Sequence, residues 1–137
     1  MKCVIDTNGL LRSIPSKSKL RWLYDSWKAK KFVWVVSNEI ITEYAEVIER
    51  EYSLQAADIV IETILTSINH QRTEASFKWQ LVEKDPDDNK FVDCAIASNA
   101  DYLVSDDKDI LQLSKIPSLF PPIPIINFDT FREVLGV

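Results

Sequence analysis

The sequence predicts an α/β fold, a three-layer α/β/α sandwich built around a mostly parallel sheet. Along the 137 residues, short apolar runs of strand length alternate with segments whose apolar residues recur at helical spacing. This alternation is typical of a parallel sheet with helices on both faces. The length and the 46% hydrophobic content fit one domain, residues 1–137, with a core of its own.

Two strands and three helical segments are expected in the first half of the chain. In order, they are a strand at 2–6, a turn at 6–9 leading into a helix near 16–30, a strand at 32–36, and helices at about 38–51 and 55–69. Asp and Gly favour the turn, and an unbroken apolar run predicts the second strand. Ser37 or Asn38 stands where a side chain would cap the helix that follows.

The second half continues the alternation with shorter elements. They are, in order, a weak strand at 78–82, a turn at 85–89, a helix at 88–99, a strand at 102–105, the start of a helix at 110–113, a strand at 125–126 and a helix near 130–135. Proline and aspartate favour the turn before the first of these helices. Four prolines between residues 117 and 124 favour an extended connection to the last strand.

The composition excludes several classes of functional site. Gly9 and Gly136 are the only glycines, so the chain lacks the glycine-rich loops that bind nucleotide phosphates. One histidine, His70, and two distant cysteines cannot build a Cys/His zinc site or a disulfide framework. Cys3 and Cys94 fall in a predicted strand and a predicted helix, where we expect small buried thiols. Any metal would therefore be held by oxygen.

Neither a secretion signal nor a membrane span is expected. Asp6 lies where the apolar core of a signal peptide would be, and nowhere do about 18 apolar residues run without interruption. The sequence therefore predicts a soluble, cytoplasmic protein that makes no contact with a membrane.

The charge is unevenly distributed along the chain. The net charge is -5, but residues 12–31 hold seven basic residues and one acidic residue, a local charge of +6 that leaves -11 for the rest. One interpretation is a solvated helix face, with Trp22, Leu23 and Trp27 on the packed side. The other is a margin that binds nucleic-acid phosphates beside an acidic site. The candidates for RNA contact are Arg12, Lys17, Lys19 and Arg21.

Three acidic positions carry the strongest indication of chemistry. Asp6 and the Asp106/Asp107 pair follow directly after predicted strands, at the edge of a parallel sheet where ligands bind. Acidic residues there can also be turn formers or helix caps. Asp93 lies among apolar residues of a predicted helix, where an isolated carboxylate is costly unless it is paired or binds a cation. The alternative for Asp93 is an ion pair with Lys90, three residues before it.

Glu43 is a further candidate. At helical spacing it borders the apolar stripe of its helix, whereas Glu39, Glu46 and Glu49 point further away. A solvated acidic face is the alternative explanation. Carboxylates gathered in one place repel each other unless a divalent cation neutralises them. Mg2+ and Mn2+ prefer oxygen ligands and bind substrate phosphates, so the pattern predicts metal-assisted hydrolysis of phosphodiester bonds.

Several short motifs resemble, in their order and spacing, those of the PIN-domain family, and in particular the VapC-like toxins of bacterial and archaeal toxin-antitoxin systems. The resemblance covers nearly the whole chain. It rests on residues 4–8, 37–44, 85–91 with 93–97, and 100–109.

The resemblance implies a PIN-like fold, an acidic site that binds Mg2+ or Mn2+, and endoribonuclease activity held in check by a cognate antitoxin protein. The catalytic acids that it implies are Asp6, Glu43, Asp93 and Asp107. Asp6, Asp93 and Asp107 would hold one or two ions, and Glu43 would bridge ions or orient the attacking water. The matching polar neighbours and the alternatives for the fourth acid are Asn8, Ser105, Asp106 and Asp109. The resemblance also implies a homodimer, and products with a 5′-phosphate and a 3′-hydroxyl.

Two other functions are compatible with the residues. A phosphatase that forms an aspartyl-phosphate would also place Asp6 after the first strand, but that class has a second Asp two residues later, where this chain has Asn8. The other alternative is a PIN-like module that binds RNA or protein without cutting. The presence of all four acids argues against this module, because a retired site has no reason to keep Asp93 buried and unpaired.

Overall fold

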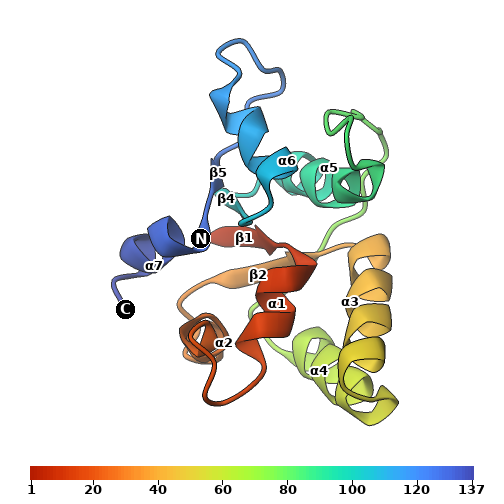
Figure 1. The fold of residues 1–137 in the computed structure, drawn as a ribbon, viewed down its shortest axis with the longest axis vertical. Helices are drawn as coiled ribbons and strands as arrows, with labels where there is room; N and C mark the ends of the chain where they lie inside the picture. The colour runs from red at the N-terminus through yellow and green to blue at the C-terminus, as the bar shows by residue number, and fades with distance from the viewer.

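A five-stranded parallel sheet forms the centre of the structure, a computed structural model that describes residues 1–137 (Figure 1). Its strands are β1 (Lys2–Ile5), β2 (Val33–Val36), β3 (His70–Arg72), β4 (Tyr102–Val104) and β5 (Ile125–Ile126). They lie in the order β3-β2-β1-β4-β5, and each neighbouring pair is parallel. The predicted α/β class is thus confirmed. Because the chain moves from β1 outward to β3 and then returns to β4, the strand order switches between β1 and β4, where sheets of this kind bind their ligands.

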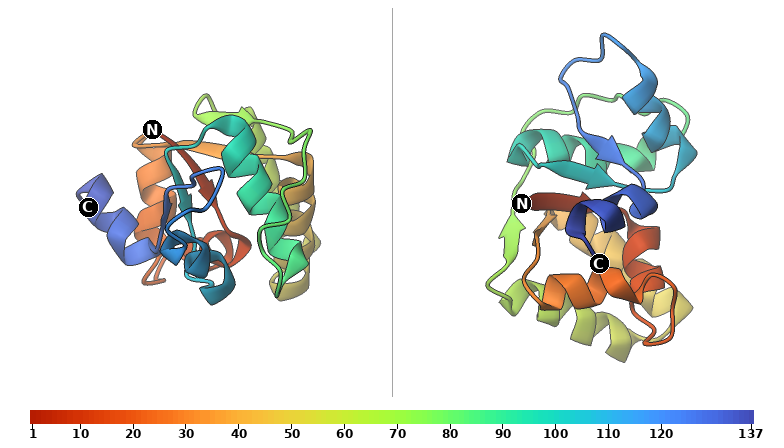
Figure 2. Two further views of the ribbon diagram at one scale, coloured as in Figure 1. Left: turned by 90° about the horizontal axis from the view of Figure 1, so that it is seen from above. Right: turned by 90° about the vertical axis from the view of Figure 1, so that its left-hand side faces the viewer.

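Seven α-helices surround the sheet. They are α1 (Thr7–Ser13), α2 (Arg21–Lys28), α3 (Asn38–Glu51), α4 (Leu54–Thr66), α5 (Asn89–Ser98), α6 (Lys108–Leu111) and α7 (Phe128–Leu135). Short 3-10 helices precede α5 at Pro86–Asp88 (η1) and follow α6 at Gln112–Lys115 (η2). Figure 2 shows α2 and α7 on one side of the strands and α5 on the other, as expected for the outer layers of a sandwich. None of the helices combines the length and the apolar character needed to cross a membrane.

The core is built from the apolar strands and a group of aromatic side chains. All residues of β2 after the half-buried Val33 are completely buried, as an unbroken apolar run predicts for a strand covered on both faces. Trp27 meets Trp34 at a ring-centroid distance of 5.5 Å, and Phe32 meets Phe131 of α7 at 5.3 Å. Both pairs are edge-to-face, the geometry that aromatic rings favour. Aromatic side chains of α2 and α7 therefore pack against the region of β2.

The third strand is not where the sequence predicts it. Residues 78–82 form no strand, and β3 is instead His70–Arg72, which pairs with β2. The end of the 78–82 segment is held by a side chain of α5, because Val82 N–H donates to Asn89 Oδ1 at 2.8 Å and Asn89 Nδ2 donates to Val82 O at 3.1 Å. β3 lies at the edge of the sheet and its polar residues are partly exposed, so it lacks the apolar pattern that marks a buried strand.

The segment after β1 also differs from the expectation. Residues 6–9 are not a free turn but the start of α1, which Asp6 caps by accepting a hydrogen bond from Gly9 N–H at 2.8 Å. The helix expected near 16–30 is the shorter α2. Aspartate favours both N-caps and turns, so the local sequence does not distinguish the two. The cap fixes the Asp6 carboxylate at the C-terminal end of β1.

Candidate metal centre

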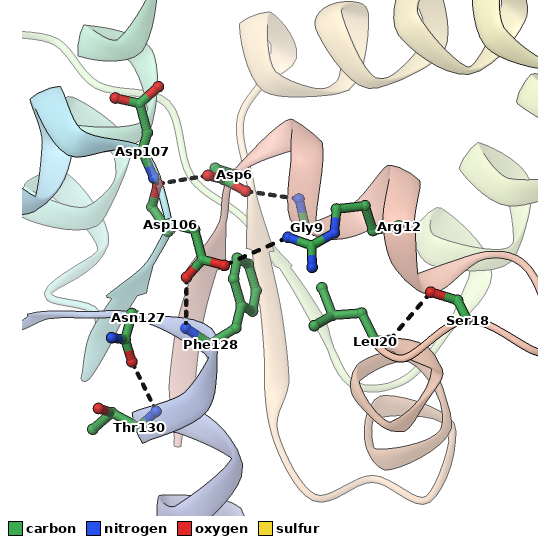
Figure 3. Close-up of polar contacts among 11 residues, drawn as sticks. Asp6, Gly9, Arg12, Ser18, Leu20, Asp106, Asp107, Asn127, Phe128 and Thr130 are labelled. Carbon is green, nitrogen blue, oxygen red and sulfur yellow. Dashed lines mark hydrogen bonds and ion pairs between the residues drawn. The ribbon is translucent and has the colours of Figure 1, made fainter.

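Asp6 lies at the end of β1, where the strand order switches, and only 6% of it is exposed. Its Oδ1 accepts the hydrogen bond from Gly9 N–H (Figure 3). Its Oδ2 accepts one from Ser105 Oγ at 2.5 Å. Burial raises the pKa of Asp6 to about 6; the two hydrogen bonds oppose this shift, and the charges of Asp106 and Asp107 add to it. The position therefore holds a buried carboxylate that is not compensated by a cation.

Ser105 connects the ends of β1 and β4. Its side chain is completely buried. Its Oγ donates to Asp6 and accepts a hydrogen bond from Asp107 N–H at 2.9 Å. This bridge fixes the Asp6 carboxylate relative to the start of α6. Ser105 thus lies beside the acids as expected, whereas Asn8 is exposed on the first turn of α1.

Asp88, Asp107 and Asp109 form a cluster that could hold a cation. One carboxylate oxygen from each lies within 4.8 Å of the other two. Asp107 caps α6, and its Oδ1 accepts a hydrogen bond from Asp109 N–H at 2.8 Å, so the start of α6 positions both acids. Asp88 comes from a different segment, the junction of η1 and α5. Acids from two segments therefore converge, and Ser105 links one of them, Asp107, to Asp6.

Asp88 is the member of this cluster that the sequence does not single out. It belongs to a run of acids at 85–88 that is typical of a turn, so the motif alone does not separate it from its neighbours. In the structure its Oδ2 is buried and has no hydrogen-bond partner. Burial first, and then acidic neighbours of which Asp107 has the largest effect, raise the pKa of Asp88 to about 7. A buried, unpartnered carboxylate oxygen is costly, and a bound cation would satisfy it.

Glu43 reaches the site from α3 but is already paired. Lys90 Nζ of α5 lies 2.6 Å from its Oε1, and Thr7 Oγ1 donates to its Oε2. The side chains of Lys90 and Glu43 are 15% and 24% exposed, so the ion pair is largely withdrawn from water. The charge of Glu43 contributes to the raised pKa of Asp88. Glu43 thus faces the cluster as expected, but as part of an ion pair.

The structure does not bring Asp93 to this cluster. Asp93 faces a pocket of about 480 Å³ between α5 and the segment 74–87. Its Oδ1 accepts a hydrogen bond from Trp79 N–H at 3.1 Å. Burial is the main cause that raises the pKa of Asp93; the Trp79 bond opposes it, Glu39 adds to it and Lys78 opposes it. The neighbours of Asp93 are therefore those of the pocket and not those of Asp6.

Helix geometry explains the different positions of Asp88, the N-cap residue of α5, and Asp93 within that helix. Five residues at roughly 100° each place Asp88 and Asp93 about 140° apart around the helix axis. Asp88, and not Asp93, is thus the acid of this region that lies with Asp107 and Asp109. The alternative ion pair between Lys90 and Asp93 is not observed either, because Lys90 pairs with Glu43.

Asp106 points in the opposite direction to Asp107 (Figure 3). Its Oδ1 accepts a hydrogen bond from Phe128 N–H at 3.1 Å, and its Oδ2 lies 3.4 Å from Arg12 Nη1. Asp106 therefore secures the start of α7 and engages one of the basic candidates for RNA contact. Of the three acids after β4, Asp107 and Asp109 are the ones that face Asp88.

The remaining basic candidates before and within α2 differ in how freely they can bind a ligand. Arg21 is engaged within the chain, since its Nε lies 3.0 Å from Asp25 Oδ1 and its guanidinium lies 4.8 Å over the ring of Tyr24. Lys17 and Lys19 are exposed in the loop before α2. The two lysines are therefore the candidates that are free to contact phosphates.

The donor set of the cluster fits a hard divalent cation. All the converging side chains offer carboxylate oxygens, which Mg2+ and Mn2+ prefer, and no histidine or thiol is among them. The unpartnered Oδ2 of Asp88 is an available ligand atom. The cluster therefore suits an ion that is held by oxygen and keeps positions for water and phosphate.

Replacing Asp88 with asparagine is expected to stabilise the protein at high pH in the absence of metal. The pKa of Asp88 is about 7 in the folded chain against the ordinary 3.8, so the cost of its ionisation grows from about pH 4 to about pH 7 and is constant above. Asp88→Asn should raise the free energy of unfolding by about 1 to 2 kcal/mol at pH 8. This is less than the full pKa shift corresponds to, because water screens part of the repulsion. At pH 4 it should change little. Thermal unfolding in EDTA at both values measures this, and a lower melting temperature of the variant at pH 8 would contradict it.

Comparison with known proteins identifies the fold. The sequence model of the PIN domain matches residues 2–109, and no curated protein matches the chain in sequence. Among solved structures, VapC20 of Mycobacterium tuberculosis, a sarcin-ricin loop cleaving toxin, is similar with a TM-score of 0.60 and 16% identity over 80% of this chain and 93% of that chain. VapBC2 from Rickettsia felis, bound to a DNA fragment from its promoter, has a TM-score of 0.64 and 17% identity over 94% of this chain and 100% of that chain. The PIN domain endonuclease Utp24 has a TM-score of 0.53 and 20% identity over 92% of this chain and 84% of that chain.

Proposed function

The chain belongs to the PIN domain family, and from this premise we propose that it is a metal-dependent endoribonuclease, the toxin of a toxin-antitoxin pair. The observation that carries the proposal is the convergence of Asp88, Asp107 and Asp109 close to the buried Asp6. Carboxylates in such an arrangement bind divalent ions that in turn bind phosphates. The shared fold with VapC20, a toxin that cleaves the sarcin-ricin loop, supports RNA as the substrate class.

The proposed ligands are the four carboxylates of Asp6, Asp88, Asp107 and Asp109. When bound, Mg2+ or Mn2+ supplies Lewis-acid chemistry, which polarises a phosphodiester and makes water nucleophilic at neutral pH. Gly9 N–H and Ser105 Oγ hold the Asp6 carboxylate in one orientation. Glu43, fixed by Lys90 and Thr7, is positioned to orient the attacking water. In this assignment Asp88 takes the role that the sequence resemblance gives to Asp93.

The proposal includes two protein partners, a cognate antitoxin and a second copy of the chain in a homodimer. VapBC2 from Rickettsia felis shares the fold over 94% of this chain, which supports the antitoxin. A protein partner that offers a basic side chain would match the uncompensated carboxylates and could block them. Size-exclusion chromatography with light scattering tests the homodimer separately from the nuclease activity.

The test of the activity is cleavage of total cellular RNA by the purified chain with Mn2+, with Mg2+ and with EDTA. We expect cutting with either ion, no cutting with EDTA, and products that carry a 5′-phosphate. Asp88→Asn protein purified in parallel controls for contaminating nucleases. Binding of RNA without cutting under all three conditions would instead support the non-cleaving module.

The double variant Lys17→Gln with Lys19→Gln is expected to weaken RNA binding about three- to tenfold at low salt. Each contact with a single-stranded phosphate contributes about 0.7 to the slope of log affinity against log salt, so the slope should fall in the variant. Arg21→Gln is the control, since Arg21 is held by Asp25 and Tyr24 and its loss should change thermal stability and not the slope. Fluorescence anisotropy with an RNA oligonucleotide in EDTA measures the affinity. Equal slopes in wild type and double variant would favour the solvated helix face.

A further inference from the structure

Lys90 is a basic side chain inside an otherwise acidic site. It lies on α5, two residues after Asp88, and its Nζ is 2.6 Å from Glu43 Oε1. The second oxygen of Glu43 accepts the hydrogen bond from Thr7 Oγ1. Both oxygens of this carboxylate are therefore occupied by donors of the chain itself.

The other acids of the site have no basic partner. None of the four ion pairs in the structure involves Asp88, Asp107 or Asp109, and Asp88 Oδ2 has no hydrogen-bond partner. The site thus has two parts, a Glu43–Lys90 pair that is neutral and a group of carboxylates that is not compensated. A cation taken from solution is needed in the second part only.

We propose that Lys90 is a built-in counter-ion that takes the place of a second metal ion beside Glu43, so that the centre binds a single divalent ion at the carboxylates of Asp6, Asp88, Asp107 and Asp109. This inference rests on the metal centre of the proposed function. An ion that approached Glu43 would meet the ammonium of Lys90, and like charges at such short range repel strongly where little water screens them. Displacing Lys90 would leave its largely buried charge without a partner, which is strongly unfavourable.

Titration of the full-length chain with Mn2+ by isothermal calorimetry tests the proposal. We expect one ion per chain in the wild type and two in Lys90→Met, which keeps the apolar stem of the side chain and removes the charge. Lys90→Arg, which keeps a positive charge at this position, should bind one ion. Lys84→Met, at an exposed lysine of the neighbouring loop, is the matched control and should also bind one.

A second variant and a second readout protect the test against loss of folding. Lys90→Gln retains a hydrogen-bond donor for Glu43 without the charge, and we expect it to bind two ions as well. Electron paramagnetic resonance should show coupling between two Mn2+ ions in both neutral variants and an isolated ion in the wild type. Circular dichroism of each variant verifies that it is folded.

The outcomes separate this inference from the proposed function. Two ions in the wild type, or one ion in the folded Lys90→Met and Lys90→Gln variants, would overturn the role of Lys90 and leave the metal centre intact. Absence of Mn2+ binding by both the wild type and Asp88→Asn would overturn the metal centre itself, and the role of Lys90 with it.

Discussion

Asp88→Asn is expected to lower kcat/KM for RNA cleavage by at least about 100-fold while the chain stays folded. The substitution keeps the shape of the side chain but removes one charge from three converging carboxylates. It also reduces the capacity of the Asp88 side chain to bind a cation through Oδ2, the oxygen that is buried and has no partner in the chain. A 100-fold loss corresponds to about 2.7 kcal/mol, which is within the several kcal/mol that a metal ion contributes to such chemistry. Because the same variant is expected to be more stable at pH 8, unfolding would not explain the loss.

Asp93→Asn, at a position within α5 five residues after Asp88, is the matched control. Asp93 faces the pocket beside the 74–87 segment, and the asparagine amide oxygen can still accept the hydrogen bond from Trp79 N–H that the structure shows. We expect its kcat/KM to remain within about threefold of wild type at saturating Mn2+. If Asp93→Asn instead lost activity and Asp88→Asn kept it, the centre would lie on the other face of α5, with Asp93 in the role that the sequence resemblance implies.

The parts of the fold that depend on burial could be predicted from the sequence. Unbroken apolar runs mark β1, β2 and β4, and Ser37 caps α3 as expected, accepting a hydrogen bond from Ile40 N–H at 3.2 Å. Since the ends of parallel strands share one edge of the sheet, the sequence also predicted that Asp6 and Asp107 lie close together. Their contact through Ser105 agrees with this prediction.

The features that depend on tertiary partners could not be predicted in the same way. β3 is a polar edge strand that is recognised only by its pairing with β2. Asp93 stands out in the sequence because its neighbours are apolar, but that contrast indicates burial and not the direction in which the side chain points. Asp88 is one of several adjacent acids, and only the packing of α5 against β1 and β4 shows that it is turned toward Asp6.

Gly9→Ala is expected to lower the free energy of unfolding by about 2 kcal/mol. In most helix interiors this change is stabilising by roughly 1 kcal/mol, so the expected sign is the reverse of the usual one. The reason is that a Cβ at Gly9 would overlap the ring of Phe128, with only 2.8 Å to its Cε1 atom. Phe128 is 1% exposed, and its N–H is bonded to Asp106, so the ring has little room to move. Overpacking of this kind typically costs about 1 to 3 kcal/mol.

The double variant Gly9→Ala with Phe128→Leu tests whether this contact is the cause. Phe128→Leu alone should also be destabilising, because it leaves a space beneath α7. If the overlap is relieved in the double variant, the two effects will be less than additive by at least about 1 kcal/mol in urea or thermal unfolding. Strictly additive effects would show that Gly9 is needed for a reason other than Phe128. Since Gly9 N–H also donates to Asp6, a shift of α1 should reduce RNA cleavage in Gly9→Ala, and the double variant should recover part of it.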